Sequence, residues 1–362
     1  MEGEAEEIFA LFERASALSQ EERARLLDEL QRSAPRLARE LAALLAADAA
    51  EDSELDHELP GPLVAQALAR ASRLEDLPAR IGPYAVLRRL GRGGMGDVYH
   101  ARQERPIRRE VALKVIRLGL STHEILERFE QERRALALLD HAHIARILDA
   151  GVDELERPYF AMELVEGEPL NAHCERRKLG LDARLELFLQ LCQAVEHAHR
   201  NGVLHRDLKP SNVLVTGAGC KVIDFGVAKL VGQERDSGHA TVNGQFLGTP
   251  AYMSPEQAGA LADIDTRTDV YSLGVLLYEL LAGERPCAAA LERATSLSDM
   301  LRVVREHEPA PPSARRPELP RDLDWIVLKA LEKERERRYR SAAELAADVE
   351  RFRRHEPIRA RP

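Results

Sequence analysis

A glycine-rich segment is the first part of the chain whose residue types could do chemistry. Residues 91–98 read G-R-G-G-M-G-D-V, which fits the pattern G-x-G-x-x-G-x-V. Glycines let a backbone approach phosphates closely and direct N–H groups at them. The pattern also occurs in dinucleotide-binding turns, where a helix follows directly. Here the β-type run DVYHAR follows, so we predict a hairpin that covers nucleotide phosphates, formed by Gly91, Arg92, Gly93, Gly94, Met95 and Gly96.

A lone lysine follows inside an apolar, strand-like run. Val111-Ala-Leu-Lys114 begins after the glycine segment, and Lys114 is the first lysine of a chain whose earlier basic residues are all arginine. The alternative is a lysine at a sheet edge that extends its amine into solvent. A cation in a buried strand, however, requires an anion, and a nucleotide phosphate supplies one.

Two further motifs carry carboxylates and an amide. His205-Arg-Asp-Leu-Lys-Pro-Ser-Asn212 comes first, and Asp224-Phe-Gly226 begins twelve residues after Asn212. Carboxylate and amide oxygens are the hard ligands that Mg²⁺ prefers. Together with the glycine segment and Lys114, these motifs stand in one fixed order along the chain.

In this order, the four motifs resemble those of eukaryotic-type protein kinases, from about Tyr84 to Phe352. The resemblance implies a bilobal α+β fold, with a small antiparallel β-rich N-lobe that contains one key helix and a large α-helical C-lobe. It implies Mg²⁺-dependent transfer of the γ-phosphoryl group of ATP, with Mn²⁺ as the alternative ion. Such transfer depends on alignment and charge neutralisation more than on covalent chemistry.

The resemblance also assigns roles to single residues. Asp207 would accept the proton of the attacking hydroxyl, and Lys209 would neutralise charge on the moving phosphoryl group. Asn212 and Asp224 would bind the metal ion. The same family pattern places Asp269 at the start of a central helix, where it would brace the catalytic loop; the alternative is a simple helix N-cap.

Nucleotide contacts follow from the same resemblance. Lys114 would hold the α- and β-phosphates, anchored by a carboxylate of the helix that follows, for which we choose Glu132 with Glu130 as second choice. Apolar residues would enclose the adenine, and the hinge would offer backbone hydrogen bonds, although each apolar residue could equally be ordinary core. The residues are Val98 and Ala112 as roof, Leu214 as floor, Met162 as gatekeeper, and Glu163 and Val165 in the hinge.

Downstream motifs indicate the acceptor class. Residues 248–256 (GTPAYMSPE) match the end of an activation segment, with Ser254 where alanine is usual in the family, and Glu256 is expected to pair with Arg338. Lys209 and the GTP run are similar to serine/threonine kinases rather than tyrosine kinases. The YMSPEQ run and the ending DLDWIVLKALEKERERRYRSAAELAADVERF resemble bacterial serine/threonine kinases in particular.

Arg206, beside Asp207, marks kinases that are regulated by a phosphate in the activation loop. A phosphate offers an arginine a bidentate partner. Within residues 227–247, Thr241 is the expected phosphorylation site and Ser237 the second choice. Self-association would allow one copy to phosphorylate another.

Composition limits the remaining classes. Residues 1–80 carry 18 acidic residues and 9 arginines, so the net charge of −9 belongs to this segment, and the rest of the chain has 61−18 = 43 acidic and 52−9 = 43 basic residues. A neutral remainder with 4% aromatic residues does not favour nucleic-acid binding. No run approaches the roughly 20 apolar residues of a membrane span. Four widely spaced cysteines indicate free thiols in a reducing, cytoplasmic compartment.

Three regions are expected. Residues 1–80 form an acidic helical extension and linker, residues 81–355 the kinase domain, and residues 356–362 a C-terminal tail that could begin a juxtamembrane stretch if the protein continues. Bacterial relatives often carry a membrane span and a sensor after the catalytic part, so a longer protein would be membrane-tethered. Two rival functions remain: a pseudokinase that serves as a nucleotide-gated binding module, and a small-molecule kinase of related fold.

Overall fold

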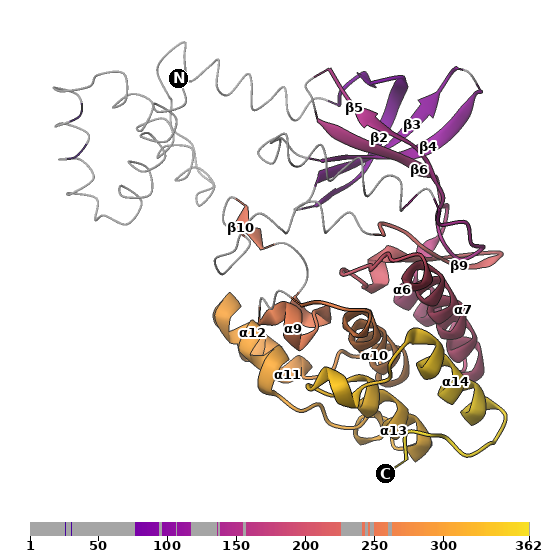
Figure 1. The fold of residues 1–362 in the computed structure, drawn as a ribbon, viewed down its shortest axis with the longest axis vertical. Coiled ribbons are helices and arrows are strands. Elements are labelled where there is room, and N and C mark those ends of the chain that lie inside the picture. The colour runs from indigo at the N-terminus through magenta and orange to yellow at the C-terminus, as the bar shows by residue number, and fades with distance from the viewer. Residues whose placement is uncertain are drawn as a thin grey trace. The chain divides into compact units, whose positions relative to one another are not determined.

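Six strands form the sheet of the smaller lobe in the computed structural model (Figure 1). Neighbouring strands pair in the order β1-β2-β3-β4-β6-β5, and every pair is antiparallel. Their bounds are β1 (Arg80–Ile81), β2 (Tyr84–Gly93), β3 (Gly96–Gln103), β4 (Arg109–Ile116), β5 (Ile147–Val152) and β6 (Pro158–Glu163). The antiparallel β-rich lobe predicted from the sequence is therefore confirmed.

The structure describes most, but not all, of the chain. The described residues are Leu26, Leu30, 77–93, 96–105, 107–116, 136, 138–154, 157–225, 241–242, 245–246, 250–259 and 263–361. The chain divides into two compact units, Met1–Leu77 and Pro78–Pro362. In the first unit, Leu26 and Leu30 are helical.

Strand β4 shows how the sheet serves two cores at once. Six consecutive residues of β4 are buried, because both faces of the strand are covered. Side chains alternate between the two faces of a strand. Val111, Leu113 and Val115 join the core of the smaller lobe, whereas Ala112 and Ile116 join the core shared with the helices. Lys114 shares the face of these two residues, so it is directed toward the helical lobe.

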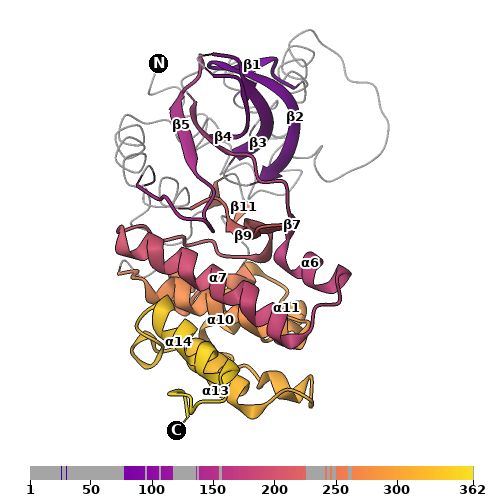
Figure 2. The ribbon, with the colours of Figure 1, turned by 90° about the vertical axis from the view of Figure 1, so that its right-hand side faces the viewer.

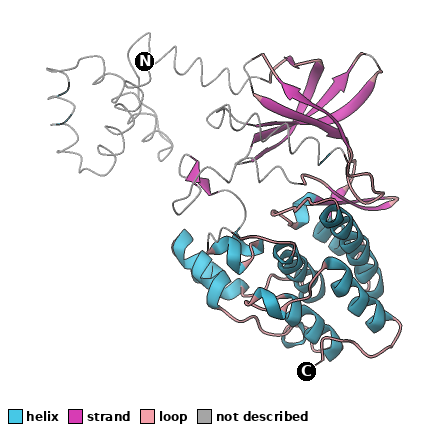
Figure 3. Cartoon of the chain, in the orientation of Figure 1, coloured by secondary structure: helices cyan, strands magenta, loops and turns pink. Residues whose placement is uncertain are grey.

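The second lobe is built mainly of helices (Figure 3). Figure 2 shows α7, α10, α13 and α14 at the end of the domain opposite β1 to β5. The helices are α6 (Leu170–Arg176), α7 (Leu181–Arg200), α9 (Pro255–Ala258), α10 (Arg267–Ala282), α11 (Ala288–Arg293), α12 (Leu297–Glu306), α13 (Arg321–Ala330) and α14 (Ala342–Arg353). The remaining strands are β7 (Glu168–Pro169), β8 (Val213–Thr216), β9 (Gly219–Val222), β10 (Thr241–Val242) and β11 (Gln245–Phe246).

Helix α10 is the centre of this lobe. Its central run is apolar on all sides, which predicts a helix buried all round. Val270, Leu273 and Val275 are each at most 1% exposed. Gly274 allows close contact with α13, because an added Cβ would lie 2.8 Å from the Cβ of Ala330. Gly283 follows the last turn with φ of 81°, a conformation that favours glycine and ends the helix.

The two lobes are joined by backbone pairing as well as by the hinge. Ile144, just before β5, forms a parallel bridge with Val222 of β9. The N–H of Ala145 donates to the carbonyl of Val222, and the N–H of Val222 donates to the carbonyl of His143. Strand β9 leads directly to Asp224, so this pairing fixes the segment that carries a predicted metal ligand.

The segment after α14 packs on the helical lobe. Ile358 is 6% exposed and belongs to the main core, and the N–H of Arg359 donates to Asp348 at 2.9 Å. The guanidinium of Arg361 binds the carboxylate of Asp322 through both of its oxygens. Among the described residues, no helix is long and apolar enough to cross a membrane.

Because Ile358 is buried, we expect Ile358→Ala to lower the free energy of unfolding by about 2–4 kcal/mol. Ile107, which is 72% exposed, provides the matched control, and Ile107→Ala should change stability by less than about 0.5 kcal/mol. Urea unfolding of both variants measures the difference. Equal stability of the two variants would show that the segment after α14 does not contribute to the core.

Candidate active site

Lys114 and Asp224 meet between the two lobes. Lys114 lies in β4, opposite Val98 on β3 and Phe160 on β6, and is 6% exposed. Its Nζ lies 3.1 Å from Oδ2 of Asp224. The anion that the buried lysine requires is therefore a carboxylate in this structure. The lysine predicted to bind phosphate and the aspartate predicted to bind metal therefore lie side by side.

A second cluster of polar side chains forms on the loop of residues 205–212, here called the catalytic loop. Oδ2 of Asp207 accepts hydrogen bonds from Nζ of Lys209 at 2.7 Å and from Nδ2 of Asn212 at 3.3 Å. Nδ2 of Asn212 also donates to the carbonyl oxygen of Asp207 at 2.8 Å. Pro210–Asn212 forms a single 3₁₀ turn, which folds the chain back so that Asn212 reaches Asp207. The structure thus brings together the residues predicted as base, cation and metal ligand.

Asp269 binds the backbone of the catalytic loop. Its carboxylate is fully buried and accepts hydrogen bonds from the backbone N–H groups of His205 and Arg206 and from Nε2 of His199, each at 2.8 Å. Burial alone raises the pKa of Asp269, but the bonds and charge of His199 outweigh it and hold the pKa below its usual value. Thr266, not Asp269, is the N-cap residue of α10. Of the two interpretations of Asp269, the structure supports the one in which Asp269 braces the catalytic loop.

His205 is held as a neutral ring. Burial lowers its pKa despite the nearby carboxylates of Asp269 and Asp207. Its Nε2 lies 3.0 Å from the carbonyl oxygen of Ile223, which can only accept, so Nε2 carries the proton. Nδ1 then accepts from the N–H of Asp207 at 3.3 Å. The ring joins the loop of Asp207 to the segment that leads to Asp224.

The predicted adenine site draws on both lobes. Ala112 of β4 pairs with Met162 of β6, and Glu163 ends β6. Val165 lies in the loop after β6, whereas Leu214 lies in β8 and Val98 in β3. Met162, Asp224 and Phe225 line one small cavity of about 10 Å³. The carboxylate of Glu163 accepts from Nζ of Lys221 at 2.9 Å, a contact between the hinge and β9.

The glycine segment forms a β-hairpin, as predicted. Gly91, Arg92 and Gly93 end β2, and Gly93 pairs with Gly96 at the start of β3. Gly96 has φ of 152°, and an added Cβ would lie 2.0 Å from the carbonyl oxygen of Val115. Only glycine fits this position. Gly94 and Met95 lie outside the described residues.

Some predicted residues cannot be placed. Glu132, Glu130 and Ser237 lie outside the described part of the chain. Thr241 lies in β10, which pairs with β11, but only its backbone is described. These assignments stay predictions.

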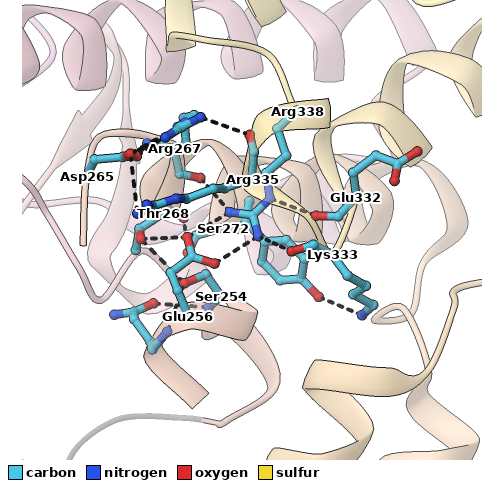
Figure 4. A network of polar contacts seen from close by, with 12 residues as sticks. Ser254, Glu256, Asp265, Arg267, Thr268, Ser272, Glu332, Lys333, Arg335 and Arg338 are labelled. Atoms are coloured by element: carbon cyan, nitrogen blue, oxygen red, sulfur yellow. Dashed lines mark hydrogen bonds and ion pairs between the residues drawn. The ribbon is translucent and has the colours of Figure 1, made fainter. Parts of the chain in front are cut away.

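The pairing of Glu256 with Arg338 is confirmed (Figure 4). Nη1 and Nη2 of Arg338 donate to the two carboxylate oxygens of Glu256 at 2.7 and 2.8 Å. Thr268 donates to the same carboxylate at 2.8 Å. Arg338 also donates to the backbone carbonyls of Glu332, Lys333 and Arg267, so every side of the guanidinium is bonded. The end of the activation segment is thereby fixed to the helical lobe.

Sequence reasoning missed two polar contacts of this site. Gln257 donates to the carbonyl oxygen of Arg206, and Lys221 binds Glu163. The run S-P-E-Q does signal a capping box, which the structure contains at the start of α9. Nothing in that run signals the contact with the catalytic loop.

Comparison with known proteins agrees with this geometry. The model of the family described as protein kinase domain matches residues 84–348. The chain belongs to the protein kinase family. Among curated relatives, a probable serine/threonine-protein kinase of Streptomyces coelicolor, SCO3848, is 41% identical over 287 residues. The serine/threonine-protein kinase PknB of Mycobacterium tuberculosis is 41% identical over 279 residues.

These two alignments cover 75% of this chain but only 40% and 43% of the relatives, so the chain spans about two fifths of their length. The crystal structure of the PknI kinase domain of Mycobacterium tuberculosis aligns with a TM-score of 0.58 and 28% identity, covering 76% of this chain and 98% of that one. The bilobal kinase fold and the resemblance to bacterial serine/threonine kinases are therefore confirmed. A pseudokinase is not favoured.

Proposed function

We propose that this kinase domain transfers the γ-phosphoryl group of ATP to serine or threonine hydroxyls of proteins. One observation carries the proposal: Asp207 lies in a cluster with Lys209 and Asn212, while Lys114 lies at 3.1 Å from Asp224. A general base must be positioned before its basicity can serve catalysis. Short contacts of Asp207, Lys209 and Lys114 support these proposed roles of base, cation and nucleotide-binding lysine.

Each residue then has a defined task. Asp207 orients the acceptor hydroxyl and accepts its proton, and Lys209 stabilises the charge that develops on the transferred group. Lys114 exchanges the carboxylate of Asp224 for the α- and β-phosphates when the nucleotide binds. Glu132 is the proposed anchor of Lys114, and the apolar residues Val98, Ala112 and Leu214 are proposed to enclose the adenine.

The donor set suits a divalent metal ion. Asp224 offers carboxylate oxygens, and the bonds of Asn212 to Asp207 both use Nδ2, which leaves its amide oxygen for the ion. Oxygen ligands of this kind favour Mg²⁺, with Mn²⁺ as the alternative. The ion would neutralise charge on the phosphates and fix their orientation.

A transfer assay tests the proposal. The purified chain is incubated with ATP labelled at the γ-phosphate, with Mg²⁺ or Mn²⁺, and with myelin basic protein as a generic basic acceptor. Label on phosphoserine and phosphothreonine, abolished by EDTA, is the expected result. Binding of ATP without any transfer would favour the nucleotide-gated binding module, and label on a small molecule alone would favour the small-molecule kinase.

Lys114→Met is expected to reduce transfer by about 100-fold or more, because the phosphates lose the cation that aligns them. The same labelled-ATP assay measures this loss. Lys329→Met is the matched control: Lys329 lies on α13 against the ring of Tyr339, with Nζ 4.8 Å from the ring centroid. The control should keep the activity of the unaltered chain. Full activity of Lys114→Met would assign the task to another lysine.

Regulation and location complete the proposal. Thr241, with Ser237 as second choice, is proposed as the site of autophosphorylation, carried out between two copies of the chain. Phosphate on Thr241 in the unaltered chain but not in Asp207→Asn, both from one host, is the result that mass spectrometry should give. The domain is proposed to act in the cytoplasm, tethered to a membrane if the polypeptide continues past Pro362.

A further inference from the structure

The side chain of Gln257 bonds in two directions. Its Oε1 accepts from the N–H of Ser254 at 3.0 Å, which closes the capping box of α9. Its Nε2 donates to the backbone carbonyl of Arg206 at 2.7 Å, across 51 residues of sequence. One amide therefore connects the platform, defined as residues 250–259, with the catalytic loop.

The carbonyl that Gln257 binds belongs to the peptide bond that joins Arg206 to Asp207. That peptide unit is planar, so holding its oxygen fixes the orientation in which Asp207 begins. Arg206 itself has φ of 65°, a left-handed conformation that is unfavourable for a residue with a Cβ. Such a conformation persists only where its surroundings hold it.

The surroundings hold this backbone from two sides. The carboxylate of Asp269 accepts the N–H of Arg206 at 2.8 Å, and the amide of Gln257 donates to its carbonyl. Asp269 belongs to α10 and Gln257 to α9, so the two contacts come from different elements. Of these two contacts, the one made by Gln257 depends on the position of the platform.

The capping box of α9 alone does not explain why residue 257 is a glutamine. A glutamate serves equally well as the acceptor in a capping box. With glutamate at position 257, however, a carboxylate oxygen would face the carbonyl oxygen of Arg206, and neither group could donate. The bond at 2.7 Å requires the N–H₂ of glutamine.

We propose that Gln257 is a positioning residue, which couples the folded platform to the orientation of Asp207. Because the platform must be ordered for Gln257 to reach Arg206, the base is aligned when the platform is folded. This inference rests on the proposed function of the domain as a protein kinase.

The test uses Gln257→Glu, Gln257→Met and Ser254→Ala in the full chain. Gln257→Glu keeps the acceptor of the cap but removes the donor, and Gln257→Met removes both at similar volume. Ser254→Ala removes the other half of the cap and leaves the bond to Arg206. Melting temperatures establish which variants are folded, so Gln257→Met serves if Gln257→Glu is not.

We expect kcat for myelin basic protein to fall about 10- to 100-fold in both Gln257 variants, as for displacement of a group that orients a reacting residue. KM for ATP and the affinity for ADP should change less than about threefold, and Ser254→Ala should keep kcat within about threefold. Amide hydrogen exchange should accelerate at residues 204–208 in the Gln257 variants only.

The outcomes separate the two proposals. An unaltered chain that binds ATP but transfers nothing would overturn the proposed function. An active unaltered chain with unchanged kcat in Gln257→Glu or Gln257→Met would overturn the role of Gln257 alone. An equal loss of kcat in Ser254→Ala would reduce that role to capping of α9.

Discussion

Asp207→Asn is expected to lower phosphoryl transfer at least about 10³-fold while the affinity for ATP stays near that of the unaltered chain. The carboxylate of Asp207 accepts from Lys209 at 2.7 Å and from Asn212 at 3.3 Å, so it is already oriented before a substrate arrives. An amide of the same shape can keep such contacts through its oxygen, but it cannot accept a proton from the hydroxyl. The variant therefore loses the proton acceptor but keeps the contacts that orient the side chain.

Transfer to myelin basic protein and calorimetric ATP binding measure the two effects separately. Asp322→Asn is the matched control, because Asp322 of α13 binds Arg361 and touches none of the residues of the site. The control should retain both activity and binding. If Asp207→Asn kept more than a few per cent of the activity, the assignment of the base would be wrong.

The sequence predicts the parts of this domain that local pattern determines. The short apolar run of β4 and the longer apolar run of α10 each predict a buried element of its own length. The motifs that hold Lys114, Asp207 and Asn212 could be found because each residue type has a chemical reason to stand where it does. Their order along the chain resembles that of protein kinases, and this resemblance implied the fold.

Through the family resemblance the sequence predicted one contact across the fold, between Glu256 and Arg338, but it did not predict the others. No motif spacing predicts that Lys114 contacts Asp224, 224−114 = 110 residues later. The expected pairing of Lys114 with Glu132 lies outside the described residues and stays a prediction. The contact of Gln257 with Arg206 spans 51 residues and depends on how α9 docks. Contacts between residues so far apart in the sequence are determined by tertiary packing, which neither propensity nor motif spacing encodes.

Arg338→Met is expected to lower the free energy of unfolding at pH 7 by about 3–5 kcal/mol. Glu256 is 5% exposed and Arg338 is 3% exposed, so both charges are out of water. Methionine has a similar length and apolar stem, so the variant fills much of the space but leaves the carboxylate of Glu256 with Thr268 as its remaining side-chain donor. The stability falls because the charge of Glu256 stays buried without its partner, rather than because one contact is missing.

An exposed pair provides the control for this prediction. Arg302 is 62% exposed in its pair with Asp299 at 2.8 Å, so Arg302→Met should cost less than about 1 kcal/mol. Urea unfolding at pH 7 compares the two variants. Equal losses would contradict the assignment of the Glu256–Arg338 pair as a buried structural contact.

The pH dependence of stability gives a sharper test, because the pKa of Glu256 is shifted in opposite directions in the unaltered chain and in Arg338→Met. In the unaltered chain, burial raises the pKa of Glu256, but the bonds and charge of Arg338 outweigh it and leave the pKa below the ordinary value of 4.5. That stabilisation is present above pH 4.5 and is lost as the pH falls through the lowered pKa. Without Arg338, burial dominates and the pKa of Glu256 rises above 4.5.

In Arg338→Met, the folded state then takes up a proton that the unfolded state does not yet bind. Its destabilisation is complete at pH 7 and is relieved as the pH falls toward 4.5, so the gap to the unaltered chain should narrow between pH 7 and pH 5. The double variant Glu256→Gln/Arg338→Met carries no charge to bury, so it should recover part of the lost stability at pH 7 and show no such narrowing. A gap that stayed constant with pH in Arg338→Met would mean that Glu256 is not the group left unpaired.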